Sequence, residues 1–162
     1  MRGRELLISK ARIQSALTHI KKRLTWLMAS KIDTQSVSVG ERGERIAEQH
    51  LKRSGYRILF RSYRTSLGEI DLVVLGKTRT GAKQIVFVEV KAWTNPSEGG
   101  PSDAVDDRKQ ERLTRLALEF LKKYRLLDCP ARFDVVEVVL NPLSVRHFEN
   151  AFEATGKYQW FS

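Results

Sequence analysis

Two segments that otherwise have the composition of buried β-strands contain ionisable residues. Asp71 lies in the run Glu-Ile-Asp-Leu-Val-Val, and Glu89 and Lys91 lie in the run Val-Phe-Val-Glu-Val-Lys. Burying a charge in a sheet costs several kcal/mol unless the charge is paired or binds a metal ion. These three residues therefore need either a partner or a function.

The chemistry open to these residues depends on how the two segments pair. In a hairpin, Asp71 and Glu89 can lie side by side, and with the carbonyl of Val90 they offer the hard oxygen ligands that Mg²⁺ or Mn²⁺ prefers. A metal ion held there would polarise a phosphodiester and lower the pKa of an attacking water. Lys91 could position that water or neutralise charge that grows on the phosphoryl group.

Side chains alternate between the two faces of a strand, and this alternation assigns the three residues to faces. Glu89 and Lys91 share one face, opposite the valines of their segment. Asp71 is expected on the face opposite Ile70, Leu72 and Val74. A solvated sheet face with alternating charges gives the same pattern, so Glu-x-Lys alone is weak support for a catalytic site.

The composition describes a basic globular protein. Of 162 residues, 29 are Lys or Arg and 19 are Asp or Glu, which gives a net charge of +10, and 41% are hydrophobic. These values exclude an acidic scaffold and a wholly disordered chain. Charges interrupt every apolar stretch before it reaches the roughly 18 residues of a membrane span, so no stable membrane insertion is expected. With Cys129 as the single cysteine, no internal disulfide can form, and a reducing, cytoplasmic location fits best.

Residues 1–38 differ from the rest of the chain, because they contain eight Lys or Arg and only two acids. Their apolar residues recur at three- and four-residue steps, which predicts a basic amphipathic helix followed by a polar linker. Charges break the apolar run that a secretory signal requires, whereas an organelle transit peptide stays open as an alternative. A further hypothesis is that this arm docks on an anionic membrane or a partner helix. We expect a helical extension over 1–38 and a folded domain over 39–162.

Within the domain, the apolar spacing predicts an α/β fold with a sheet flanked by helices. A first helix ends at a left-handed glycine, Gly55, and three neighbouring strands follow it as a meander. A second, crossover helix, with Arg108, Lys109, Arg112 and Arg115 expected around its outer side, then leads to the last strands. The predicted elements are a helix over 40–54, strands over 56–64, 69–75 and 84–92, a helix around 113–121, and strands over 132–140 and 145–148.

Five motifs, in this order, resemble those of the YraN family of uncharacterised bacterial proteins, from about residue 40 to about residue 152. They are G-E-R-I-A-E-Q-H-L from Gly43, G-E-I-D-L-V from Gly68, V-F-V-E-V-K from Val86, R-F-D-V-V-E-V from Arg132 and E-N-A-F from Glu149. That family is similar to archaeal Holliday junction resolvases, and the acid followed by Glu-x-Lys resembles the signature of the PD-(D/E)xK nuclease superfamily. The resemblance implies a restriction-endonuclease-like fold with a mixed sheet.

The resemblance also implies roles for four residues. Asp71 and Glu89 would be ligands of Mg²⁺ or Mn²⁺, and Lys91 would be the catalytic lysine. Glu44 would be an acid on the metal side of the site that acts through water, with Glu48 as the weaker candidate for that position. The chain departs from the superfamily or family pattern at Ile70, Ser62 and Trp93, which leaves the four site residues intact and concerns contacts with the substrate.

Two functions compete for this set of residues. The first is a divalent-metal-dependent endonuclease that hydrolyses phosphodiester bonds, with DNA favoured over RNA, branched DNA as a candidate substrate and a homodimer as a candidate assembly. The second is a non-catalytic nucleic-acid-binding module with the same fold. Both use a rim of basic side chains around the acidic centre. Its candidate members are Arg42, Arg45, Lys52, Arg53, Arg57, Arg61, Arg64 and the cations between Arg108 and Arg115.

Several other residues have simpler interpretations. Tyr63 and Trp93 could stack on exposed bases, but single aromatic residues are more often part of the packing. Asp134 is expected to make a structural hydrogen bond at the start of a strand, and Cys129 is expected to be an inert thiol. The three histidines are expected to be structural or surface residues, because they form no ligand spacing: His19, His50 and His147.

Overall fold

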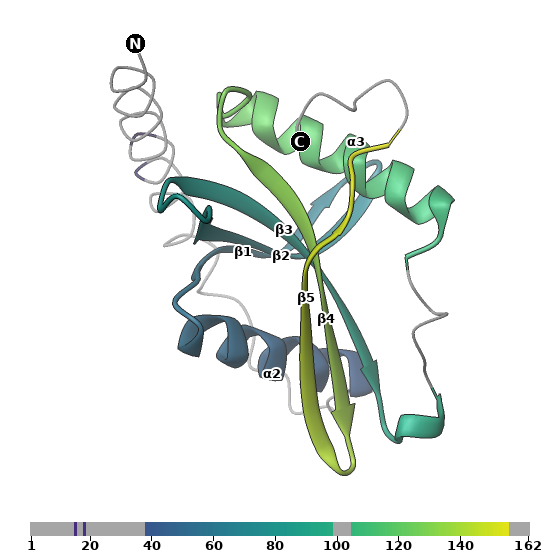
Figure 1. Cartoon of the computed structure of the whole chain (residues 1–162). Coiled ribbons are helices and arrows are strands. Elements are labelled where there is room, and N and C mark those ends of the chain that lie inside the picture. The colour runs from purple at the N-terminus through teal and green to yellow at the C-terminus, as the bar shows by residue number, and fades with distance from the viewer. Residues whose placement is uncertain (1–14, 16–17, 19–37, 99–104, 156–162) are drawn as a thin grey trace.

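The computed structural model describes residues 15, 18, 38–98 and 105–155. The elements are α2 (Val39–Arg53), β1 (Arg57–Thr65), β2 (Gly68–Lys77), β3 (Lys83–Trp93), the 3₁₀ helix η1 (Pro96–Glu98), α3 (Asp107–Lys123), β4 (Ala131–Leu140) and β5 (Leu143–Phe152) (Figure 1). The predicted N-terminal helix and linker lie almost entirely outside the described residues. Of residues 1–37 only Ser15 and Thr18 are described, and both are helical.

The five strands form one mixed sheet in the order β1-β2-β3-β4-β5. Neighbours pair antiparallel except β3 and β4, which pair parallel because α3 carries the chain back across the sheet between them. Helices α2 and α3 lie on opposite faces of the sheet (Figure 1). The predicted α/β class, with a mixed sheet flanked by helices, is confirmed.

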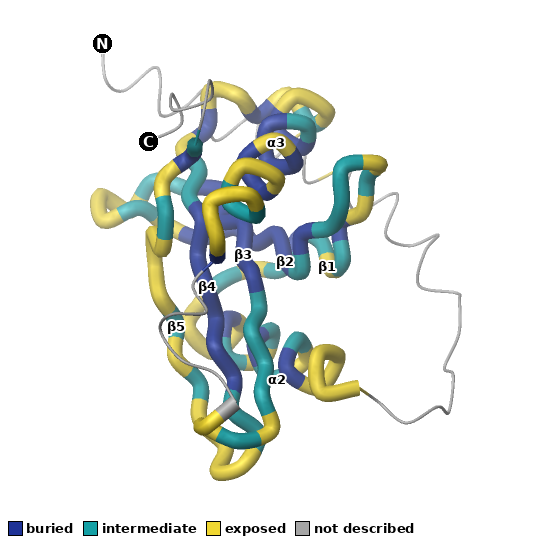
Figure 2. The backbone as a smooth tube through the Cα atoms, turned by 90° about the vertical axis from the view of Figure 1, so that its right-hand side faces the viewer, coloured by how far each residue is buried: buried dark blue, intermediate teal, exposed yellow. Residues whose placement is uncertain are grey.

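Two apolar clusters hold the helices on the sheet. The cluster under α3 includes Phe87 and Phe120, and the cluster over α2 includes Ala47 and Leu51. Figure 2 shows the buried residues gathered in the middle of β2, β3 and β4 and along one side of α3. Within the described residues, no helix combines the length and apolar character needed to cross a membrane.

Helix α2 begins and ends at residues that the sequence marks clearly. The side chain of Ser38 accepts a hydrogen bond from the backbone of Glu41, and the Glu41 carboxylate accepts one from the backbone of Ser38, which is a capping box. The helix is followed by Gly55 at φ +86°, a left-handed conformation that favours glycine. The predicted first helix and its glycine stop are confirmed.

The structure corrects the bounds of the last strand and decides between the two interpretations of Tyr63. The last strand spans Leu143–Phe152 rather than 145–148, because an edge strand faces solvent on one side and accepts polar residues that weaken the sequence signal. Tyr63 is only 6% exposed and packs edge-to-face against Phe120, so it belongs to the core and is not available to stack on a base. Trp93, at the end of β3, is half-buried.

Candidate functional site

The site begins where β2 and β3 separate. Their ladder runs from Lys77 paired with Lys83 to Leu72 paired with Val88, and no pair follows it toward the start of β2. Beyond this point the carboxylate of Asp71 accepts a hydrogen bond from the backbone N–H of Val90 across 2.7 Å. The structure therefore brings Asp71 against the Glu-x-Lys segment, in the arrangement expected from the hairpin.

The expected faces of β2 need one correction. Leu72 and Val74 pack together in the α2-side cluster. Ile70 instead packs in the α3-side cluster with Val73. The alternation is interrupted between Ile70 and Leu72, where the β2–β3 ladder ends and where Ser62 of the neighbouring strand β1 has φ +45°.

Glu89 is the most enclosed member of the site, with a side chain that is 5% exposed. Its Oε1 lies 3.7 Å from the Nζ of Lys91 on the same strand. A second ammonium group, that of Lys109 on α3, forms a direct ion pair with the same oxygen. The two lysines are about a quarter exposed, so each ammonium connects the buried carboxylate to the surface.

Lys109 was expected on the outer side of its helix, and that expectation is wrong. Lys109 precedes Leu113 by four residues and Leu116 by seven, which places it on the buried stripe of α3. The N-cap Asp106 fixes this turn, because its carboxylate accepts a hydrogen bond from the Lys109 backbone at 2.8 Å. The helical spacing in the sequence already contained the signal that Lys109 faces the sheet.

Glu44 reaches the same region from the opposite face of the sheet. A Cβ atom on the preceding residue, Gly43, would lie 2.3 Å from the Cβ of Ala92, so only glycine allows α2 to approach β3 this closely. Burial raises the pKa of Glu44, and the negative charges of Glu69 and Glu41 raise it further. Glu44 is therefore an acid in an environment that favours its proton.

Glu48, the weaker candidate for the helix acid, has a different role in the structure. Its carboxylate lies 2.6 Å from Arg61 Nε on β1 and 2.6 Å from Lys52 Nζ one helical turn later. Hydrogen bonds from Arg61 lower the pKa of Glu48, so it is a paired anion that helps to hold α2 on β1. Of the two glutamates, Glu44 is the one whose charge is felt at Asp71.

The two carboxylates of the site lie in different environments. Burial raises the pKa of Asp71 to about 7, and the neighbouring Glu89 carboxylate adds to the shift, while the Val90 N–H and Lys109 oppose it. Glu89, which is buried, and Asp71, which is half-buried, form a pair of carboxylates that suits a hard divalent cation such as Mg²⁺. The described residues contain no group of three acidic, His or Cys side chains close enough to hold a metal, so the donor set is a pair of carboxylates.

A second polar cluster lies elsewhere on the sheet, around Asp134 of β4. This side chain has no exposed surface and accepts hydrogen bonds from Arg132, from the ring of His147 and from the backbone of Asn150. The bond to Asn150 stabilises β5 where its register against β4 shifts. The expected structural role of Asp134 is confirmed, and His147 is part of the same network.

Known proteins with similar sequences identify the family. The uncharacterised protein family UPF0102 matches residues 43–138. A UPF0102 protein of Rhodopirellula baltica is 42% identical over 127 residues, which cover 75% of this chain and 74% of that protein. A UPF0102 protein of Caldanaerobacter subterraneus subsp. tengcongensis is 42% identical over 120 residues, which cover 71% of this chain and 94% of that protein.

A third relative, a UPF0102 protein of Geobacter metallireducens, is 43% identical over 118 residues, which cover 72% of this chain and 93% of that protein. The matched region of the family begins within α2 and includes strands β1 to β3 and helix α3, with all four candidate site residues. The expected family is thereby confirmed, and this chain belongs to the uncharacterised protein family UPF0102, also called YraN.

Proposed function

We propose that this protein is a divalent-metal-dependent endonuclease that hydrolyses phosphodiester bonds, with DNA as its substrate rather than RNA. The observation that carries this proposal is the Asp71 and Glu89 pair, which lies beside two lysines in a protein of net charge +10. Two acids can bind a divalent cation that acts on a phosphodiester, and the positive charge of the protein attracts the phosphate backbone of the nucleic acid.

In the proposed site, Asp71 and Glu89 hold Mg²⁺ or Mn²⁺. When bound, the cation would polarise the phosphodiester and make a water molecule a better nucleophile. The Val90 N–H keeps the Asp71 carboxylate in place through the 2.7 Å hydrogen bond, so the acid is positioned before any ligand arrives. The buried environment of Glu89 excludes water and strengthens every charge interaction of the site.

Lys91 and Glu44 have complementary roles in this proposal. The Lys91 ammonium group is tethered 3.7 Å from Glu89 and is partly exposed, so it can orient a water molecule or neutralise charge on a phosphoryl oxygen. Glu44, whose pKa is raised mainly by burial, can hold a proton and pass it through water at the edge of the site. These two residues supply the charge and the proton transfer that the carboxylate pair lacks.

A non-catalytic nucleic-acid-binding module is the second candidate. The ion pair between Lys109 and Glu89 favours it, because a lysine of the chain already neutralises one of the two carboxylates. Such a module binds nucleic acid in a salt-dependent manner, with a slope of roughly 0.9 log units of affinity per log unit of salt for each duplex phosphate neutralised. It gives no cleavage with any divalent cation.

The test incubates the full chain with labelled single-stranded, duplex, flapped and four-way-junction DNA and a structured RNA, in Mg²⁺, Mn²⁺ or EDTA. We expect cleavage of DNA that requires metal and that falls at least about 100-fold in Lys91→Ala and Glu89→Gln. Lys122→Ala is the matched control, since Lys122 is exposed at the far end of α3 and should leave cleavage unchanged. Binding without cleavage of any substrate would exclude the nuclease and leave the module.

A further inference from the structure

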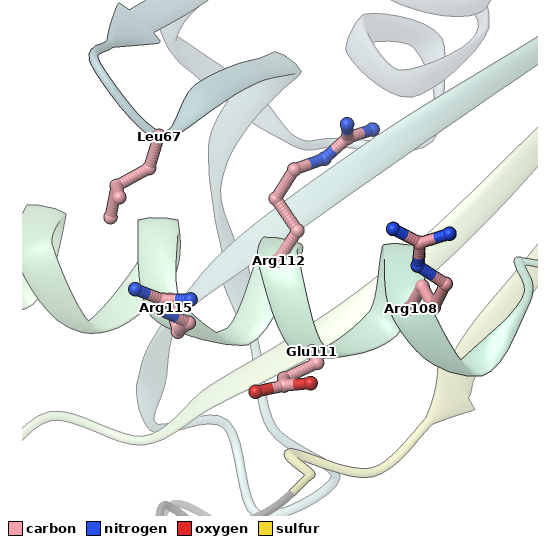
Figure 3. Close-up of a pocket in the computed structure, with 5 residues that line it drawn as sticks. All are labelled: Leu67, Arg108, Glu111, Arg112 and Arg115. Atoms are coloured by element: carbon pink, nitrogen blue, oxygen red, sulfur yellow. The ribbon is translucent and has the colours of Figure 1, made fainter.

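Helix α3 carries a row of three arginines, Arg108, Arg112 and Arg115, which we name the arginine ledge. Together with Leu67 from the turn between β1 and β2 and with Glu111, the ledge lines a surface hollow of about 210 Å³ (Figure 3). All three arginine side chains are exposed. The ledge is therefore a strongly positive surface next to a turn of the sheet.

The spacing of the ledge matches the shape of a phosphate chain. Steps of four and three residues keep the arginines on one side of the helix and spread them over roughly 10 Å at 1.5 Å of rise per residue. In Figure 3, Glu111 points away from Arg108 and Arg112, to the other side of the helix. The acid that lines the hollow thus leaves these arginines free to face a ligand.

The ledge also differs from other arginines of the protein in having no acidic partner among the residues that the structure describes. Arg61 pairs with Glu48 at 2.6 Å, and Arg132 pairs with Asp134 at 2.9 Å. Within the described ranges, no ion pair or hydrogen bond joins a ledge side chain to an acid. Three adjacent guanidinium groups without acids repel one another, so an anionic ligand would stabilise them.

The ledge is continuous with the candidate site. Lys109, next to Arg108 in the chain, is the residue that pairs with Glu89. The side chain of Arg112 lies against Gly68, where a Cβ would be 3.4 Å from its Cδ. Gly68 is the first residue of β2, three residues before Asp71. A DNA strand with one phosphate at the proposed cation site can therefore continue along the protein surface to the ledge.

We propose that the arginine ledge binds consecutive phosphates of one DNA strand, next to the phosphate at the proposed cation site of Asp71 and Glu89. The proposal rests on the proposed function and deepens it, because it assigns the surface that positions the substrate. Arginine forms bidentate hydrogen bonds with phosphate and stays charged at all working pH values. The contacts are to the backbone, so they position the strand and carry no sequence preference.

The test measures DNA binding in EDTA, where no metal-dependent cleavage interferes. The full chain is titrated with a fluorescein-labelled DNA duplex that ends in a single-stranded arm, over a series of KCl concentrations. The ledge variant replaces Arg108, Arg112 and Arg115 by Gln. The control variant replaces Lys77, Arg79 and Lys122 by Gln, which are exposed, lie outside the basic rim and produce the same change of net charge.

If the ledge binds three phosphates, the slope of log affinity against log salt falls by about 2 to 3 in the ledge variant. In the control variant the slope falls by less than about 1, because charge at a distance is screened. Both variants should melt within a few degrees of the wild type, since all six side chains are exposed.

The outcomes separate this inference from the proposed function. Equal slopes for the ledge variant and the wild type, with binding intact, would overturn the ledge and leave the site untouched. Absence of DNA binding by the wild type would overturn both. A lowered slope in the ledge variant, in a protein that cleaves no substrate, would establish the ledge while removing the nuclease.

Discussion

Two aspartates on central strands of the sheet, Asp71 on β2 and Asp134 on β4, lie in opposite electrostatic environments. Asp134 is fully buried and receives hydrogen bonds from a guanidinium group, an imidazole ring and a backbone amide. Asp71 receives a hydrogen bond from a backbone N–H, and the charge that raises its pKa most is that of the Glu89 carboxylate. Asp134 has a direct ion pair with Arg132, whereas no ion pair among the described residues involves Asp71.

This difference is the one expected between a structural carboxylate and a carboxylate of the proposed site. The network around Asp134 contains its own counter-charge, Arg132, so it needs nothing from outside the protein. The carboxylate of Glu89 pairs with Lys109 and lies near Lys91, whereas the pKa of Asp71 is raised first by burial and then by the charge of Glu89. A partly buried acid whose pKa is raised in this way is a feature of sites that bind cations or transfer protons.

The largest effect on the free energy of unfolding is expected at Asp134. Asp134→Asn keeps the size of the side chain but leaves the guanidinium group of Arg132 without its main partner inside the protein. We expect a loss of about 3 kcal/mol in the free energy of unfolding, measured with urea at pH 7. Glu111→Gln, an exposed site on α3 with the same change of charge, should change it by less than about 0.5 kcal/mol.

If Asp134→Asn proved as mild as its control, the network would contribute no more than a surface pair. The contrast between the two aspartates would then have no basis in stability.

The contribution of Asp71 to the free energy of unfolding should depend on pH in the opposite way to that of a carboxylate with a lowered pKa. Because the pKa of Asp71 is raised from 3.8 to about 7 in the folded protein, the folded state binds the proton more tightly than the unfolded state. Its contribution to stability is present at low pH and is lost as pH rises from about 4 to about 7. In Asp71→Asn this loss is absent, so the variant should gain on the order of 2 kcal/mol over the wild type across that window.

The measurement is urea unfolding of both proteins in EDTA at several pH values between about 4 and 8. The difference between the two proteins isolates Asp71 from Glu44, whose pKa is also raised and which titrates in both. A constant difference across this window would mean that the Asp71 carboxylate is compensated after all. Asp71 and Asp134 would then belong to the same class of buried acid.

The sequence predicted one side of this comparison better than the other. Strand alternation and Glu-x-Lys pointed to Asp71, Glu89 and Lys91, because charges inside β-branched runs are visible locally. The partners of Asp134 come from β4, from β5 and from the register shift between them, which no local pattern encodes. Long-range pairing is the information that a single sequence does not contain.

Two further residues show different limits of a single sequence. Lysine is usually exposed, but the spacing of Lys109 from Leu113 is a local signal that it lies on the buried stripe. For Tyr63 the sequence allows both packing and base stacking, and its contacts with Phe60 and Phe120 show that it is core. The fold class needed no such contacts, since it followed from the order and periodicity of the elements.

The ion pair between Lys109 and Glu89 allows a direct test of whether the carboxylate pair binds a divalent cation. Lys109→Met keeps the aliphatic stem but removes the cation that pairs with Glu89, so in EDTA we expect a loss of about 1 to 2 kcal/mol in stability. A divalent cation no longer competes with an ammonium group in this variant. The rise in melting temperature on adding MnCl₂ should therefore be larger in Lys109→Met than in the wild type.

Lys77→Met, at an exposed position at the end of β2, is the matched control and should behave like the wild type with and without MnCl₂. An equal manganese shift in Lys109→Met and the wild type would show that the lysine and the cation do not share a position. The carboxylate pair would then lose its interpretation as a cation site.

The smallest expected effect lies at the edge of the network around Asp134, where Tyr56 joins Arg132 to Glu149. The Tyr56 hydroxyl accepts a hydrogen bond from Arg132 at 2.8 Å and donates one to Glu149, and burial raises the pKa of Tyr56 to about 12, so the phenol stays protonated. Tyr56→Phe should reduce stability by about 1 kcal/mol at pH 7.

The hydroxyl of Tyr56 is also the main cause that lowers the pKa of Glu149. A lowered pKa stabilises the folded protein above the ordinary value of 4.5, and that contribution is lost as pH falls through the folded value. The difference between Tyr56→Phe and the wild type should therefore shrink on acidification. In a double-mutant cycle, Glu149→Gln should remove most of the effect of Tyr56→Phe. Additive effects of the two substitutions would instead mean that Tyr56 is not coupled to Glu149 and lies outside the network. The network would then consist of Asp134 and its direct partners.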